Sequence, residues 1–208
     1  MEDRLNAYRK RREREQEIKE LAAKGCYSVI LVIVALIALR PVMVEQILGR
    51  AEACSDVGLL EESRRQCEKA LLIDGESSNA WYRMACVYLT EGNRDMAYGA
   101  FQKAVQADAL NAAAHYQLGA MYVQDGRHQL AIPHLDKVRT IGPAKPARTV
   151  PAENCRHRAA LDALASCYEK MGELAKAEFT LEAIRVYYPG SCDAEARLKR
   201  VKDRQANG

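Results

Sequence analysis

The 208-residue sequence predicts an all-α protein in which a stack of short paired helices follows one long apolar helix. Three observations predict this fold class. Gly58, Gly92, Gly126 and Gly172 recur at steps of 34, 34 and 46 residues, and each lies between stretches with apolar residues at helical spacing. A single uninterrupted apolar run lies near the start of the chain. With only two phenylalanines, and β-branched runs confined to that place, the composition argues against a large sheet.

The charge balance and the cysteine pattern exclude several classes of function. The chain carries 31 Lys and Arg against 28 Asp and Glu, and a net charge of +3 is too small to indicate a nucleic-acid partner. The hydrophobic content of 49% is ample for a core. Seven cysteines occur without a CxxC or CxxCH motif, which excludes the zinc-ribbon, thioredoxin-type and c-type haem signatures.

Residues 1–24 mix both signs of charge at helical spacing. We expect a solvated cytoplasmic helix that ends at a membrane. The alternative is a contact between its basic residues and lipid headgroups, and the interleaved glutamates argue against that contact.

Residues 25–43 are predicted to form a transmembrane anchor. From Gly25 to Val44 the apolar run has 20 residues, about 30 Å as a helix, which matches the hydrocarbon thickness of a bilayer. The long preceding region and the lack of a small-x-small site disfavour a cleaved signal peptide, and a buried helix of a soluble protein is the other alternative. Seven Lys and Arg lie within residues 9–24, so the positive-inside rule places the N-terminus in the cytoplasm.

The paired-helix pattern is clearest around Gly92. Trp81, Ala85 and Tyr88 lie at i, i+4 and i+7 before this glycine, and Ala97, Phe101 and Ala104 repeat the spacing after it. The pattern returns in four copies, 44–77, 78–111, 112–145 and 158–191. A 34-residue period with small residues where helices meet and tyrosines between them resembles the tetratricopeptide repeat. The resemblance implies an all-α helical-hairpin solenoid of about four repeats over residues 44–191.

Two further segments interrupt or follow the repeats. Residues 146–157 hold two prolines, and we expect a loop on one face, either a neutral spacer or a contact loop. Residues 192–208 place Ala194, Leu198 and Val201 on one stripe of a polar helix. A helix of this kind covers the last apolar face of a solenoid, and a basic binding helix is the alternative.

The resemblance also implies a binding surface, because the first helices of successive tetratricopeptide repeats line a concave groove that binds partners. The matching groove positions are Leu48, Asn79, Tyr82, Cys86, Leu89, Tyr116, Ala120, Val123, Gln124 and Asp162. This set is mildly apolar and lacks the Lys, Arg and Asn cluster with which chaperone-binding members clamp a terminal carboxylate. We therefore expect an apolar helix or extended segment as the ligand. The alternative is that these side chains pack under neighbouring repeats.

No pattern in the sequence predicts catalysis, a metal or a cofactor. His115 falls at a repeat core position, and His128 and His134 lie six apart, which does not place them on one helix face. Cys155 and His157 have no second ligand pair at a zinc spacing. We expect no enzymatic activity, no cofactor and no small-molecule substrate.

Cys54 and Cys67 occupy inward positions on the two helices of the first repeat. A disulfide between them would contribute about 3 kcal/mol if the compartment is oxidising. Buried free thiols that act as small core residues are the alternative.

Together these features predict a non-enzymatic, membrane-anchored scaffold or adaptor that binds a partner protein and supports the assembly or stability of a membrane protein complex. The architecture resembles single-span inner-membrane tetratricopeptide proteins of bacteria, which implies periplasmic repeats. Residues 25–43 would contact the lipid bilayer, and the first repeat begins where the apolar run ends. The lack of a linker favours a partner in or on the membrane. The alternative is a periplasmic holdase or chaperone accessory for exported chains.

Overall fold

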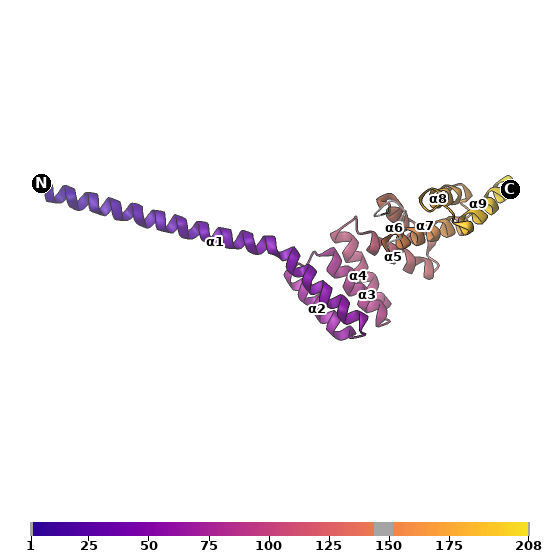
Figure 1. Cartoon of the computed structure of the whole chain (residues 1–208), viewed down its shortest axis with the longest axis horizontal. Helices are drawn as coiled ribbons and strands as arrows, with labels where there is room; N and C mark the ends of the chain where they lie inside the picture. Colours follow the sequence, from indigo (N-terminus) through magenta and orange to yellow (C-terminus); the bar gives the residue numbers. More distant parts are fainter. Residues whose placement is uncertain (1, 144–151, 208) are drawn as a thin grey trace. The chain divides into compact units, whose positions relative to one another are not determined.

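The computed structural model describes residues 2–143 and 152–207, with side chains for residues 19, 30–143 and 155–207, and this part of the chain is helical without strands (Figure 1). Its helices are α1 (Glu2–Asp56), α2 (Leu60–Ile73), α3 (Ser78–Thr90), α4 (Arg94–Ala107), α5 (Ala112–Gln124), α6 (His128–Ile141), α7 (Ala152–Met171), α8 (Leu174–Tyr187) and α9 (Cys192–Ala206). The predicted all-α class is confirmed.

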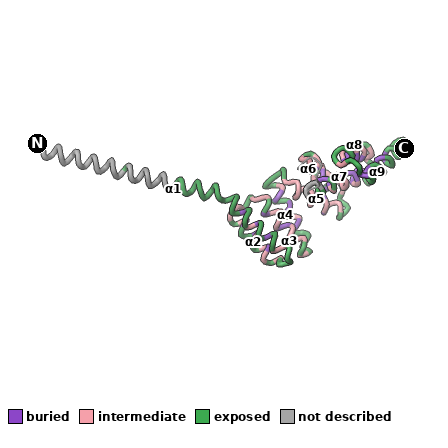
Figure 2. The backbone as a smooth tube through the Cα atoms, in the orientation of Figure 1, coloured by how far each residue is buried: buried purple, intermediate pink, exposed green. Residues whose placement is uncertain are grey.

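The chain divides into two compact units, residues 1–46 and 47–208, and α1 begins in the first and ends in the second. In the first unit the large apolar side chains from Ile30 to Met43 are 46% to 59% exposed (Figure 2). The stretch Ile30–Asp56 is long and apolar enough to cross a membrane. A signal sequence near the N-terminus meets the same criteria of length and composition. Only 6% of the most apolar window of Ile30–Asp56 is buried, so this stretch is not packed as the core helix of a soluble protein is.

The second unit is built from helical hairpins. Helices α3 and α4, α5 and α6, and α7 and α8 pack as pairs. Before these pairs, the last turns of α1 form a hairpin with α2, where the Ser63 hydroxyl donates to the Ala51 carbonyl at 2.7 Å. After the last pair, α9 packs on α8.

The turn inside each hairpin ends the first helix in the same way. Gly58, Gly92, Gly126 and Gly172 all have positive φ, between +72° and +82°, a backbone conformation that favours glycine. The glycine N–H donates to the carbonyl three residues earlier at 3.0–3.3 Å, and the next N–H donates to the carbonyl five residues earlier at 2.8–2.9 Å. This pair of bonds satisfies the last helical carbonyls. The recurring glycines therefore repeat the same turn.

Polar side chains fix the join between successive hairpins. Ser77 and Asn111 accept from the N–H groups of Ala80 and Ala114 and cap α3 and α5. The Asn111 amide also donates to the Ser78 hydroxyl, which donates in turn to the Ala104 carbonyl, both at 2.8 Å. This chain of bonds ties α5 to the preceding hairpin.

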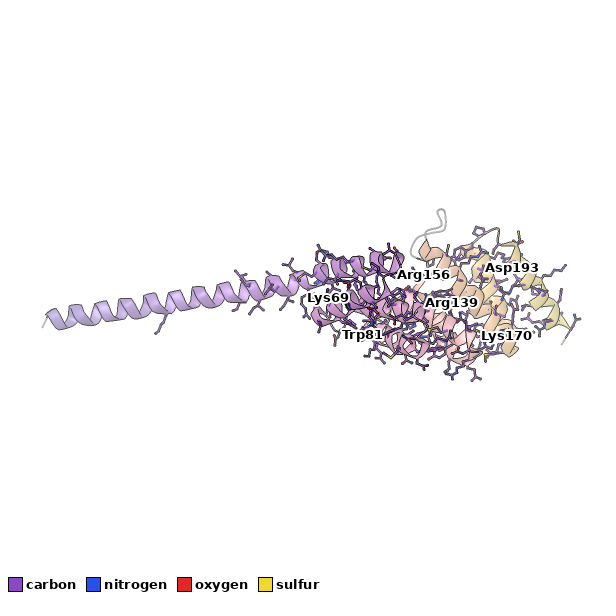
Figure 3. All side chains as sticks on the ribbon, turned by 90° about the horizontal axis from the view of Figure 1, so that it is seen from below. Lys69, Trp81, Arg139, Arg156, Lys170 and Asp193 are labelled. Atoms are coloured by element: carbon purple, nitrogen blue, oxygen red, sulfur yellow. The ribbon has the colours of Figure 1, made fainter. Side chains whose placement is uncertain are left out.

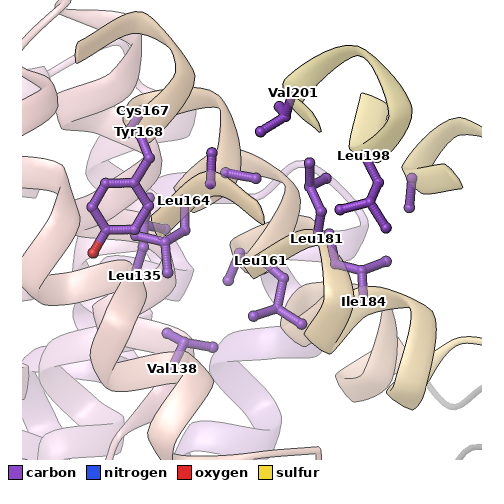
Figure 4. Packing of buried hydrophobic residues seen from close by; sticks show 14 of the residues in the cluster. Leu135, Val138, Leu161, Leu164, Cys167, Tyr168, Leu181, Ile184, Leu198 and Val201 are labelled. Atoms are coloured by element: carbon purple, nitrogen blue, oxygen red, sulfur yellow. The ribbon is translucent and has the colours of Figure 1, made fainter. Parts of the chain in front are cut away.

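The core between the helices consists largely of alanine and leucine. Figure 4 shows Leu135, Val138, Leu161 and Leu164 packed between α6 and α7, within a cluster that continues through α8 to α9. The small residues allow the close approach that the repeat pattern implies. At the closest point, a Cβ added to Gly119 would lie 2.6 Å from the Leu135 side chain.

The start of α7 differs from the sequence prediction. Residues 152–157 were expected to belong to a loop, but they are helical and extend α7 by a turn and a half beyond the start of the fourth repeat. The expectation was wrong because these six residues contain neither Gly nor Pro and run in register into the helix that follows. Helix α7 packs against α5 as well as α6.

Candidate partner-binding groove

Six of the predicted groove residues form a half-buried set, which we call the central stripe. Its members are Tyr82, Cys86 and Leu89 on α3 and Tyr116, Ala120 and Val123 on α5. Within each helix the three residues are spaced so that they share one face. The ring of Tyr82 lies 5.8 Å from that of the fully buried Phe101, so the inner part of this face belongs to the core.

Burial controls the chemistry of the α3 side of the stripe. Loss of solvation raises the pKa of the Tyr82 phenol and of the Cys86 thiol. It also raises the pKa of the neighbouring Cys67 to about 11. These thiols are therefore protonated at neutral pH, unlike the low-pKa thiolates of reactive cysteines.

Two cavities share Arg156 in their lining, and the first of them borders the central stripe at Tyr82 and Cys86. The first has a volume of about 160 Å³ and is lined by Ala51, Glu52, Ser55, Ser63, Tyr82, Arg83, Cys86, Val87 and Arg156. The second has a volume of about 480 Å³ and is lined by Ala112, Ala113, Val138, Ile141, Gly142, Pro143, Arg156 and His157. The larger one lies within the size range of ligand sites in proteins. The α3 side of the stripe therefore borders a hollow and not a flat surface.

Among the residues with described side chains, only Arg156 lines both cavities, and it is labelled in Figure 3. Its side chain is exposed and comes from the helical extension of α7. The sequence prediction missed this residue because the repeat pattern does not specify the position of residues inserted between two repeats. A signal was nevertheless present, since residues 152–157 lack helix breakers.

The two end members of the predicted groove do not line it. Leu48 is only 1% exposed and belongs to the core, because the last turns of α1 bury this face against the first hairpin. Asp162 faces Arg197 of α9 at 3.6 Å, and that arginine also donates to Glu169 and Ser166 at 2.8 and 2.9 Å. The groove-facing residues of the fourth repeat thus contact the capping helix α9.

The remaining predicted residues lie at the margins. Asn79 is exposed at the start of α3. Gln124 is exposed at the end of α5 and accepts from Arg94 at 3.2 Å, beside the Arg94–Asp125 ion pair. The structure therefore concentrates the free groove surface on the central stripe and the two cavities.

Cys54 and Cys67 are both free thiols, with Cys67 buried and Cys54 half-buried. The disulfide stays a prediction for an oxidising compartment. Among the residues with described side chains, no group of three or more His, Cys, Asp or Glu could hold a metal ion.

A histidine pair escaped the sequence prediction, which considered only histidines on a single helix. The Nδ1 atoms of His115 on α5 and His134 on α6 lie 3.1 Å apart, and the Tyr122 ring stacks on His134. Burial lowers the pKa of both imidazoles. At this distance one Nδ1–H donates to the other ring, so the pair requires that at least one ring be neutral.

Comparisons with known proteins identify the repeats. Family models described as tetratricopeptide repeat match residues 78–109 and 159–191. Among solved structures, YrrB, described as a TPR protein with an unusual peptide-binding site, is 25% identical with a TM-score of 0.59, and the match covers 77% of each chain. PilF of Pseudomonas aeruginosa is 18% identical with a TM-score of 0.62, and the match covers 81% of this chain and 71% of that one.

A further similar structure is MamA of Desulfovibrio magneticus RS-1, which is 18% identical with a TM-score of 0.59, over 78% of this chain and 85% of that one. The search of curated proteins gave no significant match. The chain therefore contains tetratricopeptide repeats, arranged as a helical solenoid, and the predicted fold class is confirmed. Proteins of this class act through protein–protein interaction and are generally not enzymes.

Proposed function

We propose that this protein is a membrane-anchored scaffold that docks a segment of a partner protein in its groove and supports the assembly or stability of a membrane protein complex. The observation that carries the proposal is the pair of cavities, about 160 and 480 Å³, that are both lined by Arg156, the first of which borders the half-buried central stripe at Tyr82 and Cys86. Half-buried tyrosine and aliphatic side chains offer apolar area to a ligand at little entropic cost. The peptide-binding site reported for the similar protein YrrB supports the same use of this fold.

The anchoring part of the proposal is supported by the apolar side chains of residues 30–43. Ten large apolar side chains are 46% to 59% exposed there. Together they form a larger exposed apolar surface than water-soluble monomers usually carry. A bilayer would cover them. With basic residues concentrated in residues 9–24, the proposed topology places the N-terminus in the bacterial cytoplasm and the repeats in the periplasm.

A cavity-filling substitution tests the docking function. Ala113→Gln places a larger neutral side chain in the second cavity, at the second position of α5, where glutamine suits a helix. The matched control is Ala175→Gln, at the exposed second position of α8. We expect the tagged full-length wild type and the control to co-purify the same partner from mild detergent, and Ala113→Gln to lose it.

Two other outcomes would contradict the proposal. Equal recovery with Ala113→Gln would show that the partner does not dock in the second cavity. Recovery of many unrelated unfolded chains in place of one stoichiometric partner would favour the holdase alternative. Circular dichroism of both variants separates a blocked groove from a misfolded solenoid.

A further inference from the structure

We propose that the first cavity accepts the carboxylate of an Asp or Glu side chain in the docked segment, and that Arg156 is the residue that selects it. This inference rests on the proposed docking function. It assigns the chemistry of the partner, an acidic side chain flanked by apolar ones, to residues that the repeat pattern does not specify.

The charges around the first cavity leave one cation in excess. Arg83 and Glu52 face each other at 2.8 Å and neutralise one another. Arg156 has no ion pair or hydrogen bond among the residues with described side chains, and the cavity lining holds no other charged group. A guanidinium that lines a small cavity and has no partner among the described side chains attracts an anion, and it can hold a carboxylate by two parallel hydrogen bonds.

Neighbouring groups agree with this assignment. Arg156 lies close enough to the Tyr82 hydroxyl and the Cys86 thiol to lower the pKa of both, against the larger effect of burial. Ser55, half-buried, adds a hydroxyl to the lining. The volume of about 160 Å³ equals roughly five waters at about 30 Å³ each, which suits one side-chain head and not a folded element.

The placement of Arg156 favours a side chain over a chain terminus. Since Arg156 lines both cavities, a segment that occupies them both must pass over it, with main chain continuing on each side. The second cavity is lined by Ala112, Ala113, Val138, Ile141 and Pro143, which suits an apolar flank of the same segment. Glu52, which also lines the first cavity, disfavours a second negative charge there.

The test uses the full-length protein in detergent and pools of 12-residue peptides blocked at both ends. The pools share Leu, Val, Ala, Tyr and Ser at random positions and differ only in a central Glu, Gln or Lys. We expect the Glu pool to be retained about 10-fold more strongly than the Gln pool, as a charge-assisted pair implies. Arg156→Glu should remove this preference and favour the Lys pool. Arg200→Glu, which makes the same charge change at an exposed site of α9, should behave as the wild type.

Each other result has a defined meaning. Equal retention of the three pools, by the wild type and Arg156→Glu alike, overturns the inference and leaves groove docking intact. No retention of any pool by the wild type overturns the docking function and this inference with it. Equal losses in Arg200→Glu would show a general charge effect and overturn the role of Arg156. Binding of a Gln pool with free carboxyl ends as strongly as the blocked Glu pool would overturn the inference, because the ligand group would then be a chain terminus and not a side chain.

Discussion

At the scale of single residues, glycine has two different roles in this solenoid. The turn glycines supply a positive φ, whereas Gly119 lies inside α5 and supplies space. Its position faces Leu135 of α6, and an added Cβ would lie 2.6 Å from that side chain. The helices of the third hairpin approach each other this closely only because the Cβ is missing.

Gly119→Ala should therefore destabilise the protein. A methyl group forced against Leu135 must displace a fully buried side chain, and overpacking of this kind costs about 1–3 kcal/mol. The control is Gly99→Ala in α4, where an added Cβ meets nothing within 4 Å. There we expect a gain of about 0.5–1 kcal/mol from helix propensity. Denaturant unfolding of both variants measures the difference, and a stable Gly119→Ala would contradict the packing argument.

The His115–His134 pair makes stability depend on pH. Burial lowers the folded-state pKa of both rings below the ordinary value of 6.5, while nearby Lys137 lowers that of His115 further and Asp108 and the Ala109 carbonyl oppose the shift. The unfolded chain then binds more protons than the folded one as the pH falls below about 7. Stability should therefore be full above about pH 7 and fall as the pH drops through the folded pKa values.

Thermal unfolding between pH 7.5 and 5 tests this expectation. Each histidine can contribute a slope of at most about 1.4 kcal/mol per pH unit. His134→Phe keeps an aromatic ring against Tyr122 and removes one titrating group, so the slope should become shallower. The variant retains His157, whose pKa burial also lowers, and so should not lose the slope completely. An unchanged slope would exclude the pair as its source.

At the scale of elements, α9 is held by one half-buried arginine, Arg197, as well as by its apolar stripe. Arg197 is only 11% exposed and reaches Asp162, Ser166 and Glu169 of α7. Burial raises the pKa of Asp162, and Arg197 opposes that shift. This contact pairs the groove-facing residues Asp162, Ser166 and Glu169 of the fourth repeat with α9.

Arg197→Met should loosen the capping helix. Methionine keeps the packing of the aliphatic stem but leaves two partly exposed carboxylates without their cation, at a cost of about 1–2 kcal/mol. Lys202→Met is the control, because Lys202 is 48% exposed where it bridges Glu178 and Glu182 and such pairs contribute less than about 1 kcal/mol. Hydrogen exchange of the α9 amides should rise in the first variant only. Equal exchange in both would assign the docking of α9 to Ala194, Leu198 and Val201 alone.

At the scale of the whole molecule, residues 30–43 determine whether the chain resides in a membrane. Val34→Glu with Ile37→Lys inserts opposite charges into the apolar run, and each costs about 2.5–3.5 kcal/mol at the centre of a span. The control, Gln102→Glu with Gln106→Lys, places the same pair on the exposed side of α4. After an alkaline carbonate wash, the wild type and the control should remain in the membrane pellet, and the span variant should appear in the supernatant. A wild-type chain whose intact mass lacks the N-terminal segment would instead identify a signal sequence.

The repeat glycines, with the small and aromatic residues around them, were sufficient to predict the hairpins and the all-α class from the sequence. Such features are local, because a glycine with positive φ and an i, i+4, i+7 stripe depend on residues within one or two turns. The faces of α3 and α5 that carry the central stripe follow from the same spacing. Tyr82 and Cys86, which this spacing places on one face of α3, both line the first cavity.

Contacts between residues far apart in the chain were decided only by the tertiary structure. The sequence could not show that Leu48 is buried, that Arg197 covers Asp162, that His115 faces His134, or that Arg156 lies between the two cavities. Each of these facts depends on how one helix packs on another, where shifts of a few ångströms determine which side chains meet. The sequence by itself thus determined the elements of this protein, and the packing of those elements decided which part of its surface is free to bind.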